Sequence, residues 1–112
     1  MEVLVNSVNG ATVVVLTGDI DGGTAPIAQS KILEQLVVGE GVILDMTAVS
    51  YMSSAGLRML LSAHRSATAK GGSVRLVGLS EDLQDTMAAT GFLDFFSTYP
   101  SVAVALAALG KE

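Results

Sequence analysis

The stretch from Val42 to Lys70 constrains the fold of this chain most strongly. It begins with a continuous apolar run typical of a buried strand, crosses a loop of small polar residues, and continues as a helix that ends at Gly71-Gly72. Ser53 and Ser54 lie where the helix begins, and Gly56 follows in its first turn. Strands that alternate with helices in this way are the units of parallel α/β sheets.

Further strands and helices are predicted on both sides of this unit. Residues 3–8 and 12–16 are predicted to pair as a hairpin through Asn9-Gly10, a dipeptide typical of two-residue turns. A helix is predicted from the N-cap Thr24 to about Val38. The strand of the central unit is predicted over residues 41–46.

The C-terminal third continues the same alternation. A strand is predicted at residues 73–77, a helix between Ser80 and Gly91, a strand or packing loop at 92–96, and a last helix capped by Ser101. The chain is therefore predicted to be one α/β domain over residues 1–112. It should contain a mostly parallel mixed sheet of four to five strands, an N-terminal hairpin and four helices.

Composition excludes several classes of function. The net charge of −5 and the six scattered basic residues disfavour nucleic-acid binding, which needs clustered Lys and Arg. The chain has no cysteine, and its single histidine, His64, is predicted to have a boundary or core role. We therefore expect no metal, no cofactor and no enzymatic activity. No signal peptide or membrane span is visible, so a soluble, cytoplasmic protein without membrane contact is expected.

Three carboxylates are predicted to gather near the carboxyl ends of the strands. Asp19 and Asp21 lie in the loop G-D-I-D-G-G, where turn chemistry is a simpler explanation than cation or phosphate binding. Asp45 closes the predicted strand at 41–46. Because ligands of open α/β sheets bind at the carboxyl ends of strands, these aspartates and Ser54 are predicted to share a functional surface.

The serine pair and Gly56 are open to two interpretations. An N-cap hydroxyl is worth about 1 kcal/mol, and most capping serines do nothing more. Gly56, however, costs a helix about 1 kcal/mol relative to alanine, so close approach of another backbone or of a partner is expected there. A phosphoryl group at this helix start would meet free amides and the positive end of the helix dipole.

Three segments resemble the STAS domain family, specifically the stand-alone anti-sigma factor antagonists of bacterial partner-switching systems. They are L-T-G-D-I-D-G-G-T-A, V-I-L-D-M-T-A-V-S-Y-M-S-S-A-G-L-R-M-L-L and V-R-L-V-G-L-S-E-D-L-Q-D-T-M-A-A-T-G-F. The resemblance extends over nearly the whole chain. The family's phosphorylated serine, in D-S-[ST]-G-L, aligns with Ser54, whereas Ser53 replaces the aspartate and Ala55 replaces the second hydroxyl residue.

The resemblance implies a non-enzymatic switch protein. Its dephosphorylated form would bind an anti-sigma factor serine kinase and release the kinase's client. Phosphorylation at Ser54, with Ser53 as the second candidate, would discharge it, and a serine phosphatase would reset it. The expected partner-binding residues are Asp19, Asp21, Asp45, Ser53, Ser54, Gly56 and Arg58.

A second hypothesis from a different class remains open. In it the carboxyl ends of the strands form a small-molecule or nucleotide pocket, and the protein is a sensor module. Asp19, Asp21, Asp45 and Ser54 would line that pocket.

Overall fold

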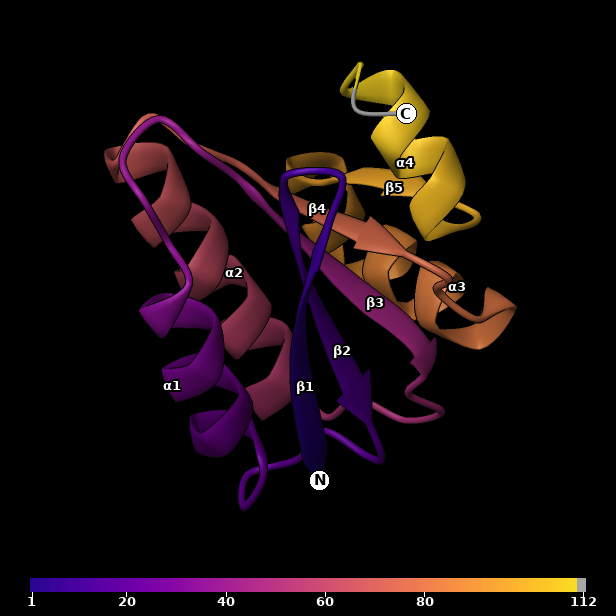
Figure 1. Cartoon of the computed structure of the whole chain (residues 1–112). Coiled ribbons are helices and arrows are strands. Elements are labelled where there is room, and N and C mark those ends of the chain that lie inside the picture. The colour runs from indigo at the N-terminus through magenta and orange to yellow at the C-terminus, as the bar shows by residue number, and fades with distance from the viewer. Residues whose placement is uncertain (111–112) are drawn as a thin grey trace.

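Five strands form one sheet in the order β1-β2-β3-β4-β5 in the computed structural model of the protein, which describes residues 1–110 (Figure 1). The strands are β1 (Glu2–Val8), β2 (Ala11–Thr17), β3 (Val42–Ala48), β4 (Val74–Val77) and β5 (Ser97–Tyr99). The helices are α1 (Ala25–Glu34), α2 (Ser54–Ala69), α3 (Glu81–Thr90), the 3₁₀ helix η1 (Phe92–Phe95) and α4 (Val102–Ala108).

The predicted hairpin and the mostly parallel sheet are confirmed. β1 pairs antiparallel with β2, and each later neighbour in the sheet is parallel. Asn9 and Gly10 both have positive φ, 51° and 80°, which is the conformation that a type I′ turn requires. One hairpin therefore supplies the single antiparallel pair of the sheet.

The two faces of the sheet bury separate cores. Val42, Leu44 and Met46 of β3 belong to a large core that includes residues of α1, α2 and α3. Ile43 points the other way and packs with Ala105 and Leu106 of α4. Figure 1 shows α1 and α2 side by side on one side of the sheet and α4 across it. The single apolar run of β3 is thus explained, because this central strand is covered on both faces.

Two of the predicted helix caps are confirmed. The Oγ of Ser80 accepts a hydrogen bond from the Leu83 N–H at 3.2 Å, and the Oγ of Ser101 accepts one from Val104 N–H at 3.2 Å. Gly91 ends α3 with φ 79°, the left-handed conformation expected of a C-terminal glycine.

One predicted boundary is wrong, and one of the two alternatives predicted for residues 92–96, the strand, is excluded. The first helix ends at Glu34 rather than near Val38, and Val38 is 76% exposed in the loop that follows. Residues 92–96 form no strand: residues 92–95 are η1, and the last strand follows at Ser97–Tyr99. The aromatic side chains of Phe95 and Phe96 instead lie beside His64, with ring centroids 5.8 and 5.4 Å away, which gives that half-buried histidine the predicted boundary role.

Candidate functional site

Two loops at the carboxyl ends of β2 and β3 are joined to each other by backbone hydrogen bonds. Ile20 and Met52 form a parallel β-bridge, in which the Ile20 N–H donates to Tyr51 C=O at 3.0 Å and the Ser53 N–H donates to Ile20 C=O at 2.8 Å. The side chains of Ile20 and Met52 are buried, whereas Tyr51 is 54% exposed. The loop before α1 and the loop before α2 therefore make one surface, at the lower end of the sheet in Figure 1.

Both aspartates of the first loop lie on this surface, and both are held by the loops. The Ser50 hydroxyl donates to Asp19 Oδ1 at 3.1 Å and so connects the two loops. Asp21 Oδ1 accepts from the Gly23 and Thr24 amides at 2.9 and 3.1 Å, and these bonds lower the pKa of Asp21 below the ordinary value of 3.8. The turn role predicted for the aspartates is confirmed at Asp21.

Thr24 behaves differently from the prediction. Its side chain makes no cap hydrogen bond with α1. Its Oγ1 instead accepts from Asp21 N–H at 2.9 Å and donates to Asp19 C=O at 2.8 Å. The Thr24 side chain therefore stabilises the loop before α1 rather than the first turn of the helix. Pro26 has no N–H, so this turn has one amide fewer that needs a cap.

Asp45 lies within β3, and the prediction that it closes this strand is wrong. β3 continues three residues further, to Ala48. In the ladder Asp45 stands opposite Val15 and Val77, on the face of the sheet that carries α4. Its Oδ1 accepts from the Thr47 N–H at 3.0 Å and from the Thr47 hydroxyl at 2.6 Å. The Asp45 carboxylate is therefore held by Thr47 of its own strand.

The two serines at the start of α2 have different environments. Ser53 occupies the N-cap position with extended backbone, φ −78° and ψ 176°, but its hydroxyl makes no cap hydrogen bond. The Ser53 Oγ is buried and has no hydrogen-bond partner among residues 1–110. Ser54 is the first helical residue and its side chain is exposed. Of the two serines, Ser54 is therefore the more exposed, whereas the hydroxyl oxygen of Ser53 is closed to solvent.

Gly56 is buried, and its missing side chain is explained within the chain. A Cβ at Gly56 would lie 2.4 Å from Met52 Cγ, 2.9 Å from Ile20 Cγ2 and 3.1 Å from the Ile20 carbonyl oxygen. The close approach expected at this glycine is therefore made by the Ile20–Met52 bridge. Gly56 lets α2 begin directly against the paired loops.

Arg58 lies one turn after Ser54 and is exposed. It borders a groove of about 330 Å³ between the first turns of α1 and α2, which is also lined by Gly22, Ala25, Pro26, Gln29, Ala55, Met59 and Ser62. The Gln29 amide donates to the Ser62 hydroxyl at 3.1 Å across this groove. Gln29, Ser62 and the exposed Tyr51 were not predicted as site residues, because no local motif marks a polar residue that faces a neighbouring helix.

The residues that share this side of the molecule define what we call the contact face: Asp19, Asp21, Tyr51, Ser54 and Arg58. It combines two acidic side chains, an exposed aromatic ring, a hydroxyl and a cation around the starts of two helices. Among residues 1–110, no group of three or more His, Cys, Asp or Glu side chains is placed to hold a metal ion. The helices of these residues include none long and apolar enough to cross a membrane.

The fold and the contact face together define a small α/β domain that presents an open surface of loops and helix starts. A family model described as STAS domain matches residues 2–105. The chain therefore belongs to the STAS domain family, as its motifs predicted.

Three individual proteins to which this chain is similar are anti-sigma factor antagonists. The anti-sigma-B factor antagonist of Listeria monocytogenes is 38% identical over 81 residues, which cover 70% of each chain. That of Bacillus subtilis is 32% identical over 79 residues, covering 70% of this chain and 72% of the relative. The crystal structure of an anti-sigma factor antagonist from Mycobacterium paratuberculosis superposes with a TM-score of 0.83 at 26% identity, covering 97% of this chain and 93% of that one.

Proposed function

We propose that this chain is an anti-sigma factor antagonist that is switched by phosphorylation of Ser54. Dephosphorylated, it binds a serine-kinase anti-sigma factor through the contact face and releases the kinase's client. Phosphorylated, it dissociates, and a serine phosphatase restores it. This role belongs to the cytoplasm, and the protein itself carries out no catalysis.

We favour Ser54 as the phosphorylated residue because the adjacent hydroxyls of Ser53 and Ser54 differ in exposure. A kinase has to bring the γ-phosphate to within bonding distance of the hydroxyl that it modifies. Ser54 is exposed, whereas the Oγ of Ser53 is buried under its neighbours. Ser54 is also the residue that aligns with the phosphorylated serine of the family motif. Both arguments favour Ser54 over Ser53.

The helix start is compatible with a phosphoryl group at Ser54. The amides of Ser54, Ala55 and Gly56 begin α2, so they have no carbonyl four residues earlier in the helix. The Ser53 hydroxyl does not cap them. Free amides and the positive end of the helix dipole both stabilise an anion, so phosphorylation should leave the domain folded.

The same group would change the charge of the contact face. A phosphoserine adds about −1.5 to −2 charges at neutral pH. Asp19 and Asp21 already make this face acidic, and Arg58 is the cation in the first turns of α2. A partner that tolerates two carboxylates would therefore meet close to twice that charge, which weakens its binding without any change of fold.

Phosphorylation by the cognate kinase tests the proposal. The wild type, Ser53→Ala and Ser54→Ala are incubated with that kinase and ATP, and the intact mass is measured. We expect the wild type and Ser53→Ala to gain one phosphoryl group and Ser54→Ala to gain none. A phosphoryl group on Ser54→Ala, or none on the wild type, contradicts the proposal.

Binding is measured separately with the same kinase and ADP. Ser54→Ala should bind as the wild type does, and Ser54→Asp and Arg58→Glu should each bind at least about tenfold more weakly. Ser30→Ala, an exposed serine on α1, is the matched control and should change neither binding nor phosphorylation. Equal affinity of Ser54→Asp and the wild type contradicts a charge-based switch.

A further inference from the structure

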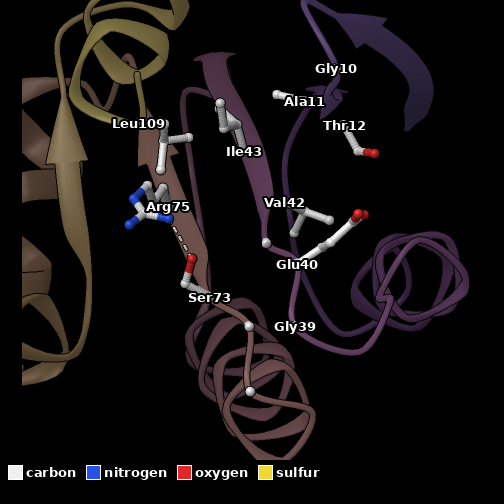
Figure 2. Close-up of a pocket in the computed structure, with 13 residues that line it drawn as sticks. Gly10, Ala11, Thr12, Gly39, Glu40, Val42, Ile43, Ser73, Arg75 and Leu109 are labelled. Atoms are coloured by element: carbon white, nitrogen blue, oxygen red, sulfur yellow. Dashed lines mark hydrogen bonds between the residues drawn. The ribbon is translucent and has the colours of Figure 1, made fainter. Parts of the chain in front are cut away.

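A second pocket lies at the other end of the sheet from the contact face, where the parallel strands begin. Its volume is about 420 Å³, within the range of small-molecule sites. It is lined by the hairpin turn, by the loops that enter β3 and β4, and by the end of α4: Gly10, Ala11, Thr12, Gly39, Glu40, Gly41, Val42, Ile43, Gly71, Gly72, Ser73, Arg75 and Leu109 (Figure 2).

Close backbone packing fixes the shape of this pocket. The Gly39 N–H donates to Lys70 C=O at 2.7 Å, and the Val42 N–H donates to Ser73 C=O at 2.9 Å. A Cβ at Gly41 would lie 2.6 Å from Ser73 Oγ, so the serine side chain occupies the space that a larger residue would fill. The two loops therefore hold the pocket wall in place before any ligand arrives.

The polar groups on one side of the pocket are hydrogen-bond donors, and not all of them have an acceptor. The Arg75 Nη1 donates to Ser73 Oγ, as the dashed line in Figure 2 shows. That bond leaves the Ser73 hydroxyl hydrogen free to donate. The Arg75 Nε is shielded from solvent and has no hydrogen-bond partner among residues 1–110. The shielded Nε does not itself face a ligand in the pocket, but it shows that the described residues leave this guanidinium incompletely paired, which is unusual in folded proteins.

The pocket's own carboxylate is not placed to pair with this guanidinium. Figure 2 shows the Glu40 side chain extending toward Thr12 and away from Arg75. The apolar side chains of Ile43 and Leu109 line the same pocket and belong to one hydrophobic cluster. A ligand that satisfies this wall needs an anionic head for Arg75 and an apolar body for Ile43 and Leu109.

We propose that this pocket binds a small organic anion with a single oxyanion head, a carboxylate or a phosphate monoester, on Arg75 and Ser73. A planar guanidinium pairs with either head through two hydrogen bonds. Glu40 at the rim and the net charge of −5 disfavour polyanions such as nucleotides. This binding site shares no residue with the contact face and goes beyond the proposed switch.

Amide NMR spectra of the full chain test the proposal with defined probes. Hexanoate and phenyl phosphate are each titrated beside their neutral counterparts, hexanamide and phenol, and inorganic phosphate is titrated alone. We expect at least one organic anion to shift the amides of Gly41, Gly72, Ser73 and Arg75. Hexanamide, phenol and inorganic phosphate should shift them at least about tenfold more weakly.

Variants of Arg75 test whether binding depends on its guanidinium group or only on the positive charge of the protein. Arg75→Gln should weaken the binding of the organic anion by about tenfold or more, because a charge-assisted bond is lost, and Arg75→Lys should retain part of it. Arg65→Gln on the exposed side of α2 is the matched control and should leave binding unchanged.

Three results overturn the proposal: equal binding of neutral and anionic probes, binding unaffected by Arg75→Gln, or dissociation constants weaker than roughly 10 mM for both organic anions. Inorganic phosphate that binds as tightly as the organic anions also overturns it, because the apolar wall would then contribute nothing. If Arg75→Gln does not fold, the proposal is tested on the wild type alone, by comparing its binding of the charged probes with its binding of the neutral ones. None of these outcomes depends on the proposed switch at Ser54.

Discussion

Ile20 and Met52 form a parallel bridge beyond the ends of β2 and β3, and both side chains are buried. The bridge joins a loop rich in glycine and aspartate to a loop that ends in two serines, although Met52 lies 32 positions after Ile20 in the chain. Because α2 begins immediately after this bridge, its first turn packs directly on both side chains. The position of Ser54 on the surface is therefore fixed by buried apolar contacts.

Gly56→Ala is predicted to destabilise the protein by about 1–2 kcal/mol. The new methyl group would overlap Met52 Cγ at 2.4 Å and Ile20 Cγ2 at 2.9 Å. Overpacking of this kind costs about 1–3 kcal/mol, and the better helix propensity of alanine recovers part of it. Urea unfolding followed by circular dichroism measures the difference.

Gly22→Ala is the matched control for that substitution. Nothing lies within 4 Å of a Cβ built at Gly22, and its φ is not in the left-handed region. Its stability should stay within about 0.5 kcal/mol of the wild type. A Gly56→Ala protein as stable as the Gly22→Ala protein contradicts the packing described for the bridge.

Ser53→Ala is predicted to leave stability unchanged or to raise it by up to about 1 kcal/mol. Its hydroxyl oxygen is buried without a partner and does not cap α2, so the substitution removes an unsatisfied polar group. Ser80→Ala should cost about 1 kcal/mol, because that hydroxyl caps α3 by accepting from the Leu83 N–H. Thermal and urea unfolding of both variants make the comparison, and a loss of 1 kcal/mol at Ser53 would mean that its hydroxyl is paired.

Most of the fold could be predicted because local chemistry and local structure agree. Asn9-Gly10 adopts the positive φ angles that its hairpin turn needs, and Ser80, Gly91 and Ser101 act at the helix ends where their residue types are favoured. Each of these depends on a few neighbouring residues. Strands that follow one another in the chain are neighbours throughout the sheet, as is common where connections are short.

The remaining features depend on contacts between distant segments. β5 is a three-residue strand, Ser97–Tyr99, that pairs with β4 and has no apolar run of its own. Asp45 was misplaced because β3 extends beyond its apolar run to Ala48. The Ile20–Met52 bridge, which explains Gly56, joins residues whose pairing no local pattern indicates.

The carboxyl group of Asp21 is predicted to titrate below the ordinary aspartate value of 3.8. Hydrogen bonds from the Thr24 and Gly23 amides stabilise its ionised form and lower its pKa. A lowered pKa in the folded state means that the carboxylate stabilises the fold above the ordinary value and that this contribution is lost as the pH falls through the folded value. Carbon-13 NMR of the side-chain carboxyl groups gives the midpoint directly.

The amides of Gly23 and Thr24 report on the same event. Their resonances should move with the Asp21 midpoint in the wild type, because protonation removes the charge that they donate to. In Asp21→Asn this acid transition should be absent. A midpoint at or above 3.8 would show that these bonds do not favour the ionised form.

Gly72→Ala is predicted to be among the most destabilising of the glycine substitutions, at about 3 kcal/mol or more. A Cβ there would lie 1.7 Å from the Glu40 carbonyl oxygen, and backbone cannot move aside as a flexible side chain can. Gly39→Ala is the matched control in the facing loop. Gly39 has φ 78° but no atom within 4 Å of its Cβ, so alanine there meets only the left-handed backbone strain of about 1–2 kcal/mol. Urea unfolding should therefore show that Gly72→Ala is clearly less stable than Gly39→Ala. Equal losses of stability would mean that the loops entering β3 and β4 can move apart. The pocket beside Arg75 would then lack a fixed wall.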